Sequence, residues 1–254
     1  MIRPHLTLDL GVRLAFLGLV LLAWVLAARA MPQYLMPSPL RVLDDMADLL
    51  MQPGLRRHIL ATVLHILAAI GAALVLGFAL VLLARAVPVL AVLIEARLTP
   101  LTNAFPAIGW TFLGVLLFGL DAGTVIFAIA AMLLPFNVIN ISQGLRGMND
   151  DLLEMAGSFT THPLRRFWLV VFPMLTPFLF ATLRLNFGVA WKVALTAELL
   201  GGNRGLGFLM NLAMQDQNTT RLLSISLLIV LFVYLMDVRL LAMLQDRFDR
   251  RFRQ

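Results

Sequence analysis

Few residues of this sequence have the types and spacings that catalysis or metal binding requires. The four histidines, at positions 5, 58, 65 and 162, are dispersed and do not have the spacing of a metal site. The sequence contains no cysteine, which excludes disulfides, thiol nucleophiles and cysteine-ligated metals. We find no Ser-His-Asp arrangement and no carboxylate pair that can be placed at one depth. We therefore predict no catalytic residue, no metal site and no enzymatic activity in this chain.

The composition indicates a membrane protein. Hydrophobic residues make up 61% of the 254 residues and charged residues only 13%, a ratio that no soluble core of this length needs. Apolar windows of roughly 20 residues recur, the length that crosses about 30 Å of hydrocarbon. We predict an all-α polytopic membrane protein, with 1–254 as a single domain. The expected spans are about 14–30, 59–84, 98–120, 124–141, 167–193 and 222–244.

The distribution of arginine predicts the topology. With the N-terminus inside, eleven arginines fall inside and six outside, which favours cytoplasmic positions for both termini and for the segment 149–166. The arginines stand at the ends of apolar runs and form no stripe, so we expect contact with lipid headgroups and no nucleic-acid binding. The first run ends at Ala28-Arg29-Ala30, which resembles a signal-peptide cleavage site. An uncleaved span and a cleaved signal both stay open.

Polar residues inside the apolar runs are candidates for a translocation path, because such groups usually face a bundle interior or a water-filled cavity. Asn137 and Asn140 lie one turn apart and share a helix face. They either line a path or make an interhelical hydrogen bond. A second group lies where proline interrupts the span 98–120, and a broken helix there either exposes backbone to substrate or is a structural kink. Its members are Asn103, Phe105, Pro106 and Trp110.

The fifth span contributes the candidates Asn186 and Lys192, and the outer segment after it contributes Glu198. Lys192 is the only lysine and lies roughly 37 Å along the helix from Phe167, near the outer membrane surface. It either extends its ammonium group into the headgroups or attracts an anionic substrate, with Glu198 setting its orientation. His65, inside the second span, is interpreted as a hydrogen-bonded packing residue.

The segment from Asn149 to Pro173 mixes charge, turn residues and helical periodicity between two apolar runs. Asn149 is suited to cap a helix, and the two aspartates that follow suit its first turn. Pro163 disfavours helix at the residue before it and favours a new helix start. The segment is therefore predicted to be a bent helical elbow on one membrane surface.

The elbow resembles the EAA motif of bacterial ABC-importer permeases, in which Glu-Ala-Ala is followed at fixed offsets by Gly, Ile and Leu-Pro. Glu154, Ala156 and Pro173 stand at the matching positions, with Val170 and Phe172 as apolar substitutes. Met155 and Thr160 replace the first Ala and the Gly, and Gly157 and Pro163 are available to supply the bend. The resemblance implies contact with an ATPase by these residues: Glu154, Met155, Ala156, Gly157, Thr160, Pro163, Arg165 and Pro173.

Further stretches are similar to the nitrate/sulfonate/taurine branch of these permeases, and the likeness covers most of the chain beyond residue 35. They are Leu183-Arg184, Gly188, Ala190-Trp191, Ala197-Glu198, Gly205-Leu206-Gly207, Pro106 and Phe118-Gly119. Thr62 and His65 depart from this branch, because Ser and Arg are expected at their positions.

The resemblance implies the type I ABC importer permease fold with a cytoplasmic coupling helix, in the bacterial inner membrane. The implied partners are cytoplasmic ABC ATPase subunits, a periplasmic solute-binding protein and a second copy of the chain. The sequence lacks G-x-x-x-x-G-K-[ST], so ATP and magnesium are expected in the ATPase, with no cofactor in this chain. The implied cargo is a small anion such as a sulfonate or nitrate. The alternatives are a scaffold without a substrate path and a carrier driven by an ion gradient, which would need intramembrane carboxylates that the mid-span regions nearly lack.

Overall fold

The computed structural model describes residues 5–147 and 162–235, and every regular element in these ranges is a helix. The prediction of an all-α membrane protein is therefore confirmed. The chain divides into two compact units, the first made of Met1–Arg57 with Leu209–Leu231 and the second of His58–Phe208 with Phe232–Gln254. The interpretation of 1–254 as a single domain stays a prediction.

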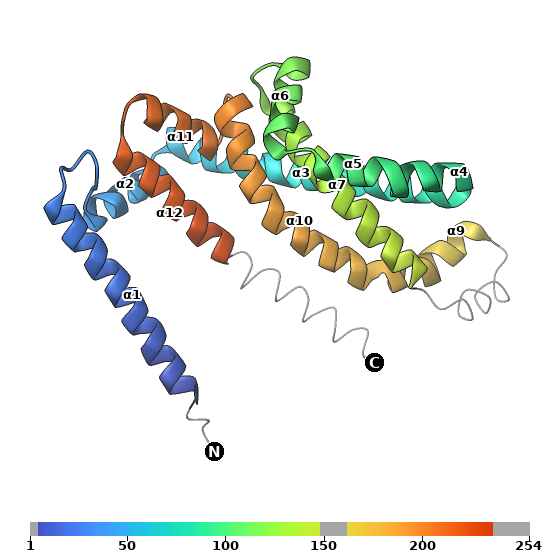
Figure 1. Ribbon diagram of the computed structural model, residues 1–254, viewed down its shortest axis with the longest axis horizontal. Helices are drawn as coiled ribbons and strands as arrows, with labels where there is room; N and C mark the ends of the chain where they lie inside the picture. The colour runs from blue at the N-terminus through green and yellow to red at the C-terminus, as the bar shows by residue number, and fades with distance from the viewer. Residues whose placement is uncertain (1–4, 148–161, 236–254) are drawn as a thin grey trace. The chain divides into compact units, whose positions relative to one another are not determined.

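The first unit contains α1 (His5–Ala30), α2 (Pro39–Met51) and most of α12 (Thr219–Leu235) (Figure 1). The helix α2 begins as its sequence indicates, because Ser38 accepts a hydrogen bond from the Arg41 amide and proline occupies the first helical position. On α12, Ser224 Oγ donates to the Val42 carbonyl at 3.0 Å, and Arg221 forms a 2.8 Å ion pair with Asp45. These bonds attach α2 to α12.

The second unit contains most of the remaining helices. Its helices are α3 (Pro53–Ala86, from His58 on), α4 (Pro88–Ala91), the π-helix η1 (Val92–Leu98), α5 (Thr99–Ala104), α6 (Ala107–Phe118), α7 (Ala122–Arg146), α9 (Pro163–Arg166), the π-helix η2 (Phe167–Val171), α10 (Phe172–Gly201) and the start of α11 (Leu206–Gln215). Figure 1 shows α10 following α9 through η2.

The helices α7 and α10 pack closely against each other, and small residues make the approach possible. A Cβ added at Gly144 would lie 2.8 Å from Phe178 Cγ, and one added at Gly201 would lie 2.7 Å from Thr124 Cγ2. The first contact is near the end of the pair closer to α9, and the second is at the opposite end. The two helices therefore touch at positions that no larger residue fits.

Three continuous helical stretches are long and apolar enough to cross a membrane: α3, α7 and Phe167–Gly201. The shorter helices Leu14–Ala30 and Thr219–Leu235 are also apolar. In the predicted span 98–120 the chain bends by 92° between Pro88–Ala104 and Ala107–Phe118. Proline explains the break, because Pro106 forces extended backbone on Phe105, which has ψ 128°.

The fifth span is longer than its predicted limits of 167–193, because α10 continues to Gly201. A carboxylate is costly in an apolar environment unless it is hydrogen-bonded. In the structure Glu198 is fully buried and hydrogen-bonded, so the helix continues through it.

Candidate functional sites

The elbow site is described only in part. Glu154, Met155, Ala156, Gly157 and Thr160 lie outside the described residues. Pro163 is the first residue of α9, as its sequence predicts. Pro173 lies in the first turn of α10, directly after η2 and inside the continuous helical stretch Phe167–Gly201, so its missing amide hydrogen removes one helical bond at this junction.

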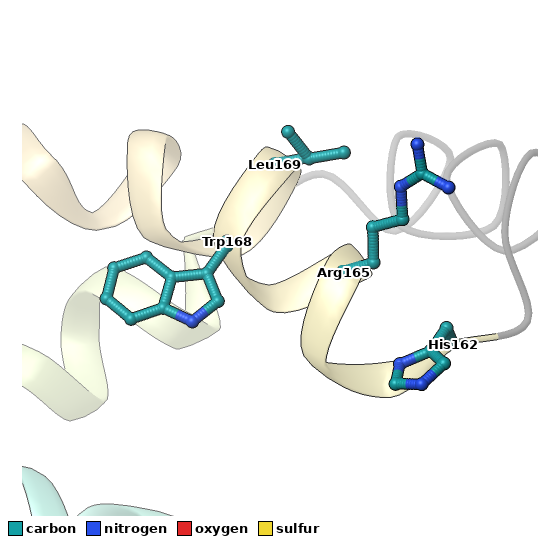
Figure 2. A pocket seen from close by; sticks show the side chains of 4 residues that line it. All are labelled: His162, Arg165, Trp168 and Leu169. Atoms are coloured by element: carbon teal, nitrogen blue, oxygen red, sulfur yellow. The ribbon is translucent and has the colours of Figure 1, made fainter.

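An open hollow lies at the C-terminal end of the predicted elbow 149–166. Its lining comes from the residue before α9, from α9 and from η2. Figure 2 shows the four side chains: His162, Arg165, Trp168 and Leu169. Arg165, Trp168 and Leu169 are exposed. One arginine with an exposed indole and an exposed leucine is a combination suited to contact with another protein.

The bend at Pro106 brings an aromatic group together. The rings of Phe105 and Trp110 meet edge to face with centroids 4.8 Å apart, and Trp110 also contacts Phe127 at 6.0 Å. The Trp110 Nε1 is buried and has no hydrogen-bond partner among the described residues. Asn103 and Pro106 are exposed beside this group. The four predicted path candidates of this stretch therefore lie at one bend.

Asn137 and Asn186 meet in the interior of the second unit. Asn186 Nδ2 donates to Asn137 Oδ1 at 2.6 Å, and both side chains are fully buried. A Cβ added at Gly77 of α3 would lie 2.7 Å from Asn137 Cβ, so α3 also approaches this point closely. Of the two interpretations given for Asn137, the interhelical hydrogen bond is observed. Asn140 shares the same face but is only half-buried.

The strongest polar cluster is centred on Glu198, which is fully buried. Its Oε2 accepts from Thr62 Oγ1 at 2.8 Å and from the Gly207 amide at 2.9 Å. Its Oε1 lies 2.9 Å from Nδ1 of His65, which is also buried. A carboxylate accepts but does not donate, so the His65 ring holds its proton on Nδ1. We call Thr62, His65, Glu198 and the segment 202–207 the Glu198 cluster. For brevity we call this segment the loop 202–207, although its last two residues begin α11.

The loop of this cluster needs glycine. Gly205 has φ +113°, and a Cβ added there would overlap the Glu198 carboxylate. A Cβ at Gly207 would lie 2.7 Å from Glu198 Cβ. The Leu206 amide donates to Thr62 Oγ1 at 2.8 Å, so one hydroxyl binds both the carboxylate and the loop. The Gly205 amide donates to Nδ1 of His58 at 3.2 Å.

The prediction that Glu198 orients Lys192 is wrong. Both carboxylate oxygens of Glu198 face the donors of the cluster, whereas Lys192 is exposed. The two residues lie six positions apart on α10, a rotation of about 600°, which leaves their side chains about 120° apart around the helix. Two predictions for Lys192 stay open: it extends its ammonium group into the lipid headgroups, or it attracts an anionic substrate.

An exposed polar contact stands next to the cluster loop. Asn203 Nδ2 donates to Asp121 Oδ1 at 3.0 Å. The neighbouring Ala122 amide and the Asn203 side chain hold the pKa of Asp121 below its usual value.

A polar group near the other end of α7 was missed by sequence reasoning. Glu95 of η1 forms an ion pair with Arg146, and Ser142 Oγ donates to Glu95 Oε1 at 2.8 Å. The spacing of Ser142 and Arg146, four residues apart on α7, is the signal that both face one partner. Among the described residues no group of three His, Cys, Asp or Glu side chains is placed to hold a metal ion.

Comparisons with known proteins identify the family of this chain. The family described as binding-protein-dependent transport system inner membrane component matches residues 78–254. The chain is 23% identical to the taurine transport system permease protein TauC of Escherichia coli over 94% of this chain and 88% of the relative. It is 25% identical to the nitrate import permease protein NrtB of Synechocystis over 84% and 77%. It is 30% identical to a probable ABC transporter permease protein of Haemophilus influenzae over 78% and 80%.

Proposed function

Because the chain belongs to the family of inner membrane components of binding-protein-dependent transport systems, we propose that it is the permease subunit of an ATP-driven importer. The observation that carries this proposal is the match to permeases over nearly the whole chain, 94% of it for the taurine permease. The apolar helices and the elbow motif support the same function.

The cargo that fits best is a small oxyanion. The named relatives include permeases for taurine, nitrate and aliphatic sulfonates, all of which carry an oxyanion group. Lys192 is an exposed cation on α10, suited to attract such a cargo. The bend at Pro106, with the unpartnered Trp110 Nε1, is our candidate for the path itself, because broken helices often line substrate sites.

The family and the elbow motif support our proposal for the partners of this chain. Two copies of the chain pair, and each places its elbow and the adjoining hollow of Arg165 and Trp168 against a cytoplasmic ABC ATPase. ATP and magnesium bind in the ATPase, and a periplasmic binding protein delivers the cargo. Both termini are cytoplasmic, which places the elbow on the ATPase side and the loop 202–207 on the periplasmic side.

Copurification with the ATPase tests this proposal. The tagged permease is coexpressed with the ABC ATPase subunit encoded beside it, solubilised in mild detergent and purified. We expect the ATPase to copurify, and we expect Glu154→Lys to abolish its recovery, because the reversed charge meets the groups that bound the carboxylate. Asp216→Lys is the matched control, since it reverses an exposed charge on another helix end and should leave recovery unchanged. Full recovery of the ATPase with Glu154→Lys would show that the elbow is not the docking element.

A further inference from the structure

Hydrogen bonds within the Glu198 cluster hold three chain segments together. The segments are α3 through Thr62 and His65, α10 through Glu198, and the loop through the amides of Leu206 and Gly207. Glu198 and Thr62 are fully buried and His65 is 6% exposed. A buried carboxylate that loses its donors is strongly destabilised, so separating any one segment from the other two is costly. Moving all three segments together breaks none of these bonds.

The cluster stands at the far end of α10 from the elbow. Counting α10 from Phe172, Glu198 lies roughly 39 Å along the helix axis. The helix α7 enters the elbow and α10 leaves it, so these two helices receive any displacement of the elbow first.

The α7–α10 pair is fixed at three levels. Near the elbow end, Gly144 packs against Phe178; in the middle, Asn137 bonds Asn186; at the far end, Thr124 packs against Gly201. Close packing at all three levels resists sliding, because each contact is nearer than another side chain would allow. A displacement at the elbow is therefore carried to the Glu198 end.

We propose that Glu198, Thr62 and His65 are coupling residues, which make the loop 202–207 follow α10 when the ATPase moves the elbow. This inference rests on the proposed function. The three side chains act by position: they hold the loop, and the cargo does not have to touch them. The exposed tip of the loop, at Asn203 and Arg204, then reports the state of the ATPase to the periplasmic face.

The sequence contains no cysteine, so single spin labels can be placed without changing native residues elsewhere. Lys192→Cys reports the position of α10, and Arg204→Cys reports the loop; both native residues are exposed. The assembled permease–ATPase complex is reconstituted in nanodiscs. Distances between the two copies of each label are then measured by pulsed electron paramagnetic resonance, without nucleotide and with ATP trapped by vanadate.

With the cluster intact, we expect ATP to shift the distance distribution at both positions. With Glu198→Gln, the shift at 192 remains, while the distribution at 204 broadens and its shift is lost. Glu95→Gln is the matched control, because it makes the same substitution at a carboxylate outside the cluster, where Glu95 contacts Ser142 and Arg146, and both shifts should persist. A narrow, fully shifting distribution at 204 in Glu198→Gln would overturn the inference.

A second pair of variants keeps the test decisive if Glu198→Gln does not assemble. His65→Phe removes the donor to Oε1 and should lose the shift at 204, whereas His65→Arg restores a donor and should regain it. Equal behaviour of these two variants would overturn the inference, since general packing would then explain the effect. If ATP shifts neither label with the cluster intact, the proposed function itself fails and the inference fails with it.

Discussion

Replacing Gly205 by alanine tests the geometry of the Glu198 cluster with one added carbon. Gly205 has φ +113°, a region that side-chain-bearing residues rarely adopt, and its new Cβ would overlap the Glu198 carboxylate. The chain must then change its backbone at 205 or displace the carboxylate from its donors. Either response weakens the attachment of the loop.

The expected cost can be worked from the two effects. Backbone strain of this kind costs about 1–3 kcal/mol. A weakened hydrogen bond to a charged group costs about 1.5–3 kcal/mol more. We therefore expect a loss of about 3 kcal/mol or more in the free energy of unfolding, which lowers the melting temperature by roughly 6–12 °C for a chain of this size.

The assay is thermal unfolding of the purified permease in one detergent, followed by intrinsic tryptophan fluorescence. Gly188→Ala is the matched control, because Gly188 lies in α10 and an added Cβ there meets nothing within 4 Å. Alanine favours a helix by about 1 kcal/mol over glycine, so this control should melt at the same temperature or slightly higher. If Gly205→Ala and Gly188→Ala melt together, the close approach of Gly205 to Glu198 is refuted.

Three further predictions follow from single contacts. Asn137→Leu should destabilise the permease by about 1–2 kcal/mol in thermal unfolding, because it leaves Asn186 without its partner, whereas the double variant with Asn186→Leu should recover most of that loss; an additive double variant would contradict the paired bond. Arg146→Met should lower the free energy of unfolding by only about 1 kcal/mol or less and change the melting temperature little, because the Arg146 side chain is largely exposed; a large loss would show that its ion pair with Glu95 carries more of the stability than this exposure allows. The lowered pKa of Asp121 stabilises the folded permease at pH values above the ordinary pKa of aspartate, and this stabilisation is lost as the pH falls through the lowered pKa. Melting temperatures measured from about pH 6 to about pH 3 should therefore fall less steeply for Asp121→Asn than for the unchanged permease. Identical slopes would exclude this contribution.

The sequence was sufficient to predict the helical class and the new helix at Pro163. These features depend on local chemistry, since apolar length, capping and the missing proline amide act within a few residues. The interruption at Pro106 was also visible for the same reason. Its 92° angle was not, because the angle depends on how the aromatic rings around Trp110 pack.

Contacts between distant segments were beyond the sequence. Glu198 was identified as a candidate, yet its partners Thr62 and His65 lie more than 130 positions earlier in the chain. A usable signal was present: a threonine and a histidine three residues apart in one span share a face and need a polar partner. The interpretation that Glu198 orients Lys192 did not include these partners. The pairing of Asn137 with Asn186 likewise needed the packing of α7 against α10.

The central claim is that ATP drives transport through this permease, and uptake into proteoliposomes tests it most directly. The permease is reconstituted with its ATPase and its binding protein, with radiolabelled taurine and nitrate as the two probes and with either ATP inside or an imposed proton or sodium gradient. We expect uptake of at least one probe that requires both ATP and the binding protein and that no gradient replaces. Uptake driven by a gradient without ATP would contradict it and would identify an ion-coupled carrier.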